Sequence, residues 1–262
     1  MNTATEAAIC AAPQESSNGE GVDIRTVLSR RSDLSTFIVH LTRDDSGKSA
    51  KDQLKSIVQS WGIQARNPFG TAVKELEKAG QPGNSQKCVC FTETPLEYLH
   101  LLLGTIKGRS RDLAPYGVAI TKKLARKKGV NPVWYVDQTL GGSHNWLTHE
   151  IDKLRDSAIA SLNFDDTPFA KIAPFIEQMG TGNRTNFYRK EFWWERQWRH
   201  VGSFKLPHHV ILICPDENGD HTTFEGLAQE EGHSAKCVDA DWGLEQIIAR
   251  LAGFSKDDIE IF

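Results

Sequence analysis

The residues best suited to chemistry lie in the stretch EFWWERQWRH, Glu191 to His200, which sets Glu195 and Arg196 among three tryptophans. One interpretation is structural: Glu195 pairs with Arg196 or Arg199, while the tryptophan rings pack at a core edge and stack on the guanidiniums. The other is functional: the rings form a platform for a planar ligand, and Glu195 lies near its reacting centre. Residue types alone leave both open.

Two more polar spots lie in predicted strands. His40 and Thr42 occupy alternate positions of STFIVHLTR (Ser35 to Arg43), so their side chains share one strand face. Thr92 ends the strand CVCFT, and Glu93 follows it. An unpaired polar group on a buried strand face costs about 1–3 kcal/mol. These residues therefore either pair with each other or face a ligand.

Composition narrows the class of protein. The chain has 262 residues with 39% hydrophobic and 25% charged residues, the balance of a globular protein with a real core. A net charge of −3 gives no global field for nucleic acid, although a local basic patch is compatible with it. The sequence contains no apolar run long enough to span a membrane and no basic-then-apolar secretory leader, so we expect a cytoplasmic protein without membrane contact.

The familiar site motifs are missing. Five cysteines lack C-x-x-C spacing, and Cys88 and Cys90 alternate in an apolar strand, where small hydrophobic side chains are the simpler interpretation. His144 and His149 do not form H-E-x-x-H, so we predict no metal site. No glycine-rich dinucleotide loop, P-loop or G-x-S-x-G follows a strand.

The elements are mixed, without a regular βαβ rhythm, and predict the α+β class. Residues 1–22 read as a disordered tail and residues 23–262 as a single α+β domain. Besides the strands above, the pattern predicts strands at Tyr116–Thr121, Asn131–Val136 and His208–Cys214.

Helices are predicted by apolar spacing and capping residues. They are Asp52–Gly62, a segment capped by Thr94 and ending at Gly104, Trp146–Leu162 capped by Ser143, Phe169–Gly180 kinked at Pro174, and a C-terminal helix with an Asp241 cap and Gly253 at its end. KKLARKKG (Lys122 to Gly129) is predicted to be a basic turn, and Arg66–Gln86 a long loop with one helical turn.

Several short segments in order give a family resemblance: VHLTR, VCFTETPLEYL, YGVAITK, PVWYV and ERQWR. Together they resemble the AbiGi family of bacterial abortive phage-infection proteins, over about Leu34 to Pro215. The resemblance implies a role in phage defence as an antitoxin or resistance component, with a toxin or antitoxin protein as partner.

More distantly, the same segments resemble the ADP-ribosyltransferase superfamily, in particular DarT-like enzymes that modify nucleic acid. That resemblance implies a split β-sheet core flanked by helices, with NAD as substrate. His40 and Thr42 would hold the nicotinamide ribose and amide, Tyr116 or its competitor Thr92 would be the middle element, and Glu195 the catalytic acid. Arg43, Arg196 or Arg199 would take the pyrophosphate.

One departure divides the hypotheses. Sequences with this resemblance tend to read E-x-E-W-R, and this chain has Gln197 at the second acidic position. If the working carboxylate belongs there, the chain is inactive, because an amide cannot replace it. Three hypotheses follow: a mono-ADP-ribosyltransferase acting on nucleic acid or protein, a non-enzymatic antitoxin or regulator, and an interaction module without a small-molecule site.

Overall fold

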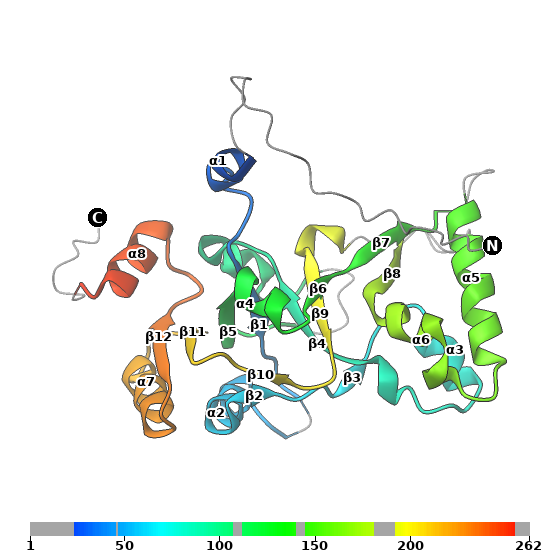
Figure 1. Ribbon diagram of the computed structural model, residues 1–262. Coiled ribbons are helices and arrows are strands. Elements are labelled where there is room, and N and C mark those ends of the chain that lie inside the picture. The colour runs from blue at the N-terminus through cyan, green and yellow to red at the C-terminus, as the bar shows by residue number, and fades with distance from the viewer. Residues whose placement is uncertain (1–23, 46, 107–111, 140–144, 181–191, 255–262) are drawn as a thin grey trace, which may run out of the picture. The chain divides into compact units, whose positions relative to one another are not determined.

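The computed structural model describes residues 24–45, 47–106, 112–139, 145–180 and 192–254 (Figure 1). The predicted disordered tail, residues 1–22, lies outside these ranges. The chain divides into two compact units, Met1–Ser32 and Asp33–Phe262. The first contains helix α1 (Ile24–Ser29). Every other helix and strand given below belongs to the second unit.

An eight-stranded mixed sheet forms the centre of the second unit (Figure 1), with the order β12-β11-β5-β1-β4-β9-β6 and β3 paired to β4. Its strands are β1 (Phe37–Leu41), β3 (Asn67–Pro68), β4 (Lys87–Thr92), β5 (Gly117–Thr121), β6 (Asn131–Pro132), β9 (Gln197–Val201), β11 (His209–Ile213) and β12 (Ser234–Val238). Among these described strands, β11 and β12 pair in parallel, and helix α7 (Asp220–Glu230) connects them. The predicted α+β class is confirmed.

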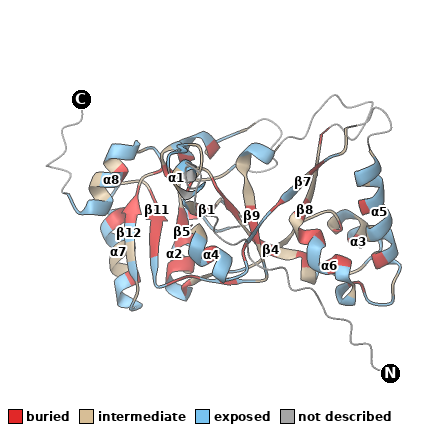
Figure 2. Cartoon of the chain, turned by 45° about the horizontal axis from the view of Figure 1, so that its top comes forward, coloured by how far each residue is buried: buried red, intermediate tan, exposed pale blue. Residues whose placement is uncertain are grey.

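Apolar side chains alternate along the strands, so both sheet faces are covered (Figure 2). On one face, Ile38, Val118 and Leu212 join a core cluster that includes residues of α2 (Ala50–Ser60), α4 (Lys122–Lys127) and α7. On the other, Val39 and Ile213 pack in a cluster with the 3₁₀ helix Leu96–Leu102 and with α8 (Leu244–Ala252). The sheet is thus the middle layer of a three-layer arrangement.

A smaller module lies at one end of the sheet (Figure 1). The parallel strands β7 (Trp134–Asp137) and β8 (Ile176–Met179) pack with α3 (Val73–Lys78), α5 (Trp146–Ile159) and α6 (Pro168–Ile172) around a separate apolar cluster. The predicted strand Asn131–Val136 is therefore two strands, β6 and β7, in different sheets. The chain changes sheet at Val133, whose N–H donates to the carbonyl of Gln197 at 2.9 Å.

β1 and β4 are neighbours but barely paired. Their register contains one residue pair, Val39 with Thr92, whereas β1 pairs with β5 at five positions and β4 with β9 at five. Beyond Val39 the two strands no longer form a ladder, and the sheet opens between them. A two-stranded ribbon of β2 (Gly62–Ile63) and β10 (Phe204–Lys205) lies outside the main sheet.

Two local predictions were wrong for reasons of hydrogen bonding. The basic segment Lys122–Gly129 is helix α4 rather than a turn, because Thr121 accepts from the N–H of Leu124 and Ala125 is buried. The segment after Thr94 is the 3₁₀ helix Leu96–Leu102 rather than an α-helix. The hydroxyl of Thr94 bonds that of Thr92 at 2.8 Å and does not cap the helix.

Two predicted helix ends also differ. Trp61, not Gly62, has the left-handed conformation after α2, with φ 46°. Its ring stacks on His233 at 3.9 Å and its Nε1 donates to the carbonyl of Pro207, contacts that hold this unfavourable backbone. The predicted kinked helix Phe169–Gly180 instead becomes strand β8 after Pro174.

The remaining element predictions are confirmed within a few residues. α5 begins after Asn145, and its predicted cap Ser143 lies outside the described residues. α8 begins after Gly243 rather than at an Asp241 cap, and it ends at Gly253 with φ 89°. In the parts of the chain that the structure describes, no helix is long and apolar enough to cross a membrane.

Candidate functional site

A cavity of about 1040 Å³ lies where β1 and β4 diverge. Residues of β1, β3, β4, β8 and β9 line it, together with one side of α2. The volume is that of a site for a small organic ligand. Residues far apart in the sequence, including His40 and Glu195, line this same cavity.

His40 lies on β1 with its ring half-buried at the cavity. Its Nδ1 is 2.8 Å from the carbonyl oxygen of Cys90, and its ring meets that of Phe91 edge-on at 5.9 Å. Burial lowers the pKa of His40; the bond to Cys90 opposes this, and the nearby charges of Arg43 and Arg66 lower it further. At neutral pH the ring is therefore uncharged, donates from Nδ1 and keeps Nε2 as an acceptor.

Glu195 is held at the turn that leads into β9. Its carbonyl oxygen accepts from the hydroxyl of Thr92 on β4 at 2.6 Å. The next residue, Arg196, has a left-handed φ of 45°, which turns the chain into β9. The carboxylate of Glu195 accepts from the amide nitrogen of Gln197 at 2.8 Å. Its backbone and side chain are thus fixed by different partners.

The polar chain continues from Gln197 to a buried ion pair. The amide oxygen of Gln197 accepts from Arg199 at 3.0 Å, and the same Nη2 of Arg199 lies 2.8 Å from the carboxylate of Glu177. Nη1 of Arg199 donates to the carbonyl of Pro174 at 2.6 Å, and the guanidinium lies over the ring of Phe69. An amide can bond a carboxylate and a guanidinium at once, so Gln197 connects Glu195 to Arg199.

Other predicted site residues have mainly structural contacts. Thr42 lines the cavity, but it is 3% exposed and its hydroxyl is 3.0 Å from the carbonyls of both Ala50 and Tyr116. Thr92 and Arg43 also line the cavity. Tyr116 does not; burial and the charge of Asp220 raise the pKa of its hydroxyl.

The predicted pairing of Glu195 with Arg196 or Arg199 is not what the described residues form. Arg196 does not line the cavity and pairs instead with the carboxylate of Asp33 at 3.3 Å. The three tryptophans also separate, since Trp198 is buried and donates to Glu93, while Trp193 and Trp194 are exposed. They do not act as one packed group.

Four further residues of the cavity lining are not predicted from the sequence. Arg66, Phe69 and Glu177 line the cavity, as does Gln53 of α2. Arg66 and Phe69 lie in the predicted loop, and Glu177 in the predicted kinked helix. No local pattern identifies them, because only the tertiary fold brings them to His40.

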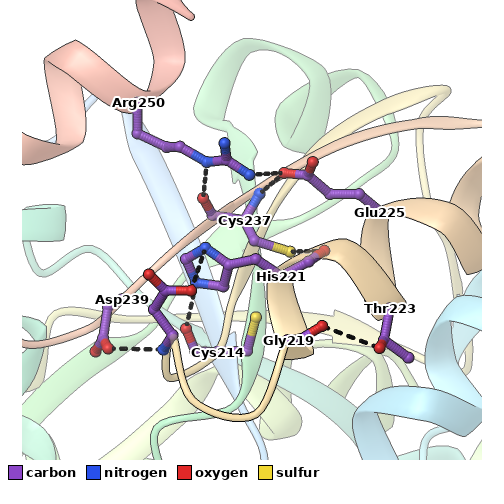
Figure 3. A network of polar contacts seen from close by, with 9 residues as sticks. Cys214, Gly219, His221, Thr223, Glu225, Cys237, Asp239 and Arg250 are labelled. Carbon is purple, nitrogen blue, oxygen red and sulfur yellow. Dashed lines mark hydrogen bonds and ion pairs between the residues drawn. The ribbon is translucent and has the colours of Figure 1, made fainter. Parts of the chain in front are cut away.

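A second polar cluster surrounds the parallel strands β11 and β12 (Figure 3). His221 bonds the carbonyl of Cys214 through Nε2 at 3.0 Å, and Glu225 accepts from the backbone of Cys237 and from Arg250. Hydrogen bonds from Cys237 and His221 lower the pKa of the Cys214 thiol to about 6 against the effect of burial. None of these five residues lines the cavity. Among the described residues, no cluster of three or more His, Cys, Asp or Glu could hold a metal ion.

Comparison with protein families identifies the chain. The family model described as "Putative abortive phage resistance protein AbiGi, antitoxin" matches residues 73–222, more than half of the 262 residues. The chain belongs to the AbiGi family. The predicted AbiGi resemblance is thus confirmed, whereas no comparison supports the DarT-like one. Comparison with curated proteins and with solved structures found no match.

The AbiGi match covers only some of the residues that line the cavity. Thr92, Glu177, Glu195 and Arg199 lie within the matched residues, whereas His40, Arg43 and Arg66 precede them. The family region therefore supplies Glu177, Glu195 and the Arg199 ion pair, whereas the acidic lining residue Asp45 precedes it. The segment before it supplies the imidazole and two more guanidiniums.

Proposed function

We propose that this chain is the antitoxin of a bacterial phage-defence pair and that it binds a toxin protein in the cytoplasm. The observation that carries the proposal is the AbiGi match over residues 73–222, whose description names an antitoxin. That segment contains β4, β5 and β9 of the main sheet and the whole smaller module, so the family region includes most of the sheet's centre.

Co-expression tests the antitoxin proposal. The product of the neighbouring gene, expressed alone in a bacterial host, is expected to arrest growth, and co-expression of this chain to restore it. A His40→Ala, Glu195→Gln double variant is expected to restore growth equally well, since neutralisation by binding needs no reaction in the cavity. Growth arrest caused by this chain alone would contradict the proposal and indicate a toxin.

A second candidate function is mono-ADP-ribosyl transfer from NAD to nucleic acid or protein. It is favoured by one observation, that His40 and Glu195 line a single cavity at the opening between β1 and β4. Such an opening is also what a split ADP-ribosyltransferase-like sheet requires. The neutral Nε2 of His40 would accept from a ribose hydroxyl, and Thr42 would hold the strand end rather than the ligand.

Glu195 would carry the chemistry. Breaking the bond between nicotinamide and ribose leaves the electron pair on nicotinamide and develops positive charge on the ribose, which a carboxylate stabilises. The acceptor nucleophile then bonds the ribose carbon and gives up its proton to solvent. Gln197 holds the carboxylate of Glu195 in place, and Thr92 holds its backbone. The mechanism assigns no role to Tyr116, which lies outside the cavity.

Nicotinamide release from NAD tests this second function, with nucleic acid or cell lysate as acceptor. Wild type is expected to release nicotinamide, and Glu195→Gln and His40→Ala to reduce the rate by about 10²-fold or more. If wild type releases none under any of these conditions, the transferase function is lost and the antitoxin proposal is unaffected.

A further inference from the structure

Helix α4, which packs on one face of the main sheet, concentrates positive charge on the surface (Figure 1). Five of the seven residues from 122 to 128 are basic, and none is acidic. Lys122 is half-buried and pairs with the carboxylate of Glu93 at 2.7 Å. The other four are exposed and form no ion pair with any residue that the structure describes; we call them the α4 basic patch: Lys123, Arg126, Lys127 and Lys128.

The like charges of the α4 basic patch destabilise the helix that carries them. Lys123 lies three residues before Arg126 and four before Lys127, so these cations are neighbours on the helix surface. A lysine in the first turn also opposes the helix dipole. The Thr121 cap and the burial of Ala125 hold the helix despite these charges. Stability of α4 therefore does not explain the patch, and a negative surface placed against it would remove the repulsion.

Two carboxylates close to the start of α4 have other cations as partners. The backbone N–H of Lys122 donates to the carbonyl of Thr36, which brings the segment before β1 to the helix. Asp33 of that segment pairs with Arg196 at 3.3 Å, and Glu93 pairs with Lys122. Neither carboxylate forms an ion pair with the α4 basic patch, so its charge is not balanced from within the described residues.

Buried rings hold two cations of the patch in place. The guanidinium of Arg126 lies over the ring of Trp198, 5.3 Å from its centroid, and the ammonium of Lys128 lies over the ring of Phe204 at 5.8 Å. Both rings are buried in the core beneath α4. A cation that is ordered over a ring loses less entropy when a partner binds it. The patch is thus partly pre-organised for an acidic partner.

Apolar side chains adjoin the α4 basic patch. Leu124 of α4 is exposed, and Trp134 at the start of β7 is 54% exposed. Pro132, two residues before Trp134, pairs in register with Trp198, whose ring lies under Arg126, so this segment runs close to the helix. Tryptophan and arginine are enriched among the residues that dominate binding at protein interfaces. The surface therefore combines positive charge with apolar contact area.

We infer that the α4 basic patch, together with Leu124 and Trp134, is the surface on which the toxin docks, and that the toxin presents an acidic surface to it. The inference rests on the antitoxin function proposed above. All these residues lie within the AbiGi match, residues 73–222, where a contact shared by the family would fall. The patch extends about 8 Å along the helix axis. A nucleic acid would run past it onto a chain with a net charge of −3, which favours a protein partner.

Biolayer interferometry of the full chain with the purified product of the neighbouring gene tests the docking surface. The Lys123→Glu, Lys127→Glu double variant is expected to weaken binding about tenfold or more, mainly through slower association, because it reverses the charge that attracts an acidic partner. Binding of wild type should also weaken as salt is raised. Trp134→Ala should weaken binding mainly through faster dissociation, because it removes apolar contact area.

Two control variants separate local charge from other effects. Lys123→Arg, Lys127→Arg keeps the positive charge and should bind as wild type does. Lys55→Glu, Lys236→Glu, at exposed lysines of α2 and β12, changes the net charge equally at another surface and should also bind as wild type. Thermal unfolding of each variant checks that the fold is intact.

The possible outcomes distinguish this inference from the antitoxin function. If wild type restores growth in co-expression but Lys123→Glu, Lys127→Glu binds as tightly as wild type, or no more weakly than Lys55→Glu, Lys236→Glu, the docking surface is wrong and the antitoxin function stands. If wild type neither binds the neighbouring product nor restores growth, both fail.

A labelled single-stranded RNA and a labelled DNA duplex probe the other class of partner. Nucleic-acid binding that is lost in Lys123→Glu, Lys127→Glu, with binding to the neighbouring product unchanged, would overturn the inference and assign the α4 basic patch to nucleic acid. Loss of binding to the neighbouring product in that variant, with no nucleic-acid binding by wild type, is the result that supports it.

Discussion

Two clusters in this molecule contain the same residue types in different settings. Each has a histidine, an arginine–glutamate pair and cysteines: His40, Arg199 and Glu177 at the cavity, and His221, Arg250 and Glu225 at β11 and β12. In the second cluster the hydrogen bonds run between neighbouring strands and helices, outside the cavity lining (Figure 3). In the first, Arg43 and Arg66 add positive charge beside the cavity.

The two histidines show what the difference means. Burial lowers the pKa of His40, with Arg43 and Arg66 adding to the effect. For His221 burial also favours the neutral form, but hydrogen bonds with Cys214 outweigh it and the pKa is raised. The surroundings of His40 disfavour its protonated form, and those of His221 favour it. Residue types that could do chemistry therefore indicate a ligand site only where a cavity accompanies them.

The largest expected effect on the free energy of unfolding is at the Arg199–Glu177 ion pair, whose counterpart in the second cluster is Arg250–Glu225. Arg199→Met removes a fully buried guanidinium from the half-buried carboxylate of Glu177, and we expect a loss of about 3–5 kcal/mol in the free energy of unfolding. Urea unfolding measures it. Arg126→Met, at an exposed arginine over the Trp198 ring, should cost about 1 kcal/mol or less. Equal losses in the two variants would contradict the assignment.

A smaller effect is expected in the second cluster. Glu225→Ala removes the acceptor of both the Cys237 N–H and the Arg250 guanidinium, and should cost about 1–3 kcal/mol in the free energy of unfolding. Glu230→Ala, at an exposed position of the same helix, is the control. Any nicotinamide release from NAD should be unchanged in both variants. Loss of nicotinamide release in Glu225→Ala alone would show that the two clusters are not separate.

The smallest effect is expected in the pH dependence of the free energy of unfolding. Because the pKa of His40 is lowered in the folded state, its contribution to stability is present above the unfolded pKa and is lost as pH falls. His221 has a raised pKa, so its contribution is present below the unfolded pKa and is lost as pH rises through the folded value. His40→Gln should therefore weaken the acid-side loss, and His221→Gln the loss on the alkaline side.

Urea unfolding between about pH 5 and 8 measures these slopes. His209→Gln, at an exposed histidine of β11, controls for the removal of an imidazole. If His40→Gln and His221→Gln change the slope in the same direction, the contrast between the two clusters is wrong.

Strands were easier to predict than their connections. β1, β4, β5 and β11 follow from β-branched, alternating or continuous apolar residues, because burial of a strand face needs that pattern. The pattern does not show which strands pair, so β6 and β7 were predicted to be one strand. The basic residues around Ala125 concealed α4, since its helix is fixed by one buried alanine and the Thr121 cap.

Part of the cavity lining coincides with the residues predicted from the sequence. His40, Thr42, Arg43, Thr92, Glu195 and Arg199 all line the cavity, and the order of short motifs pointed to them. Tyr116 and Arg196 do not line it, because one faces the charges of Lys51 and Asp220 and the other pairs with Asp33. Gln53 and Arg66 lie in an ordinary helix and a loop, so only their shared contact reveals them.

The change of sheet at Val133 links motion of the smaller module to the acid in the cavity. Val133 donates to the carbonyl of Gln197, and the N–H of Gln197 donates to the hydroxyl of Tyr135 on β7 at 3.0 Å. A rotation of β7 relative to the main sheet would therefore move the peptide groups of Gln197. Because the side-chain amide of Gln197 bonds the Glu195 carboxylate, that carboxylate would move as well. A protein that docks on the smaller module would in this way reset the geometry of the cavity without entering it.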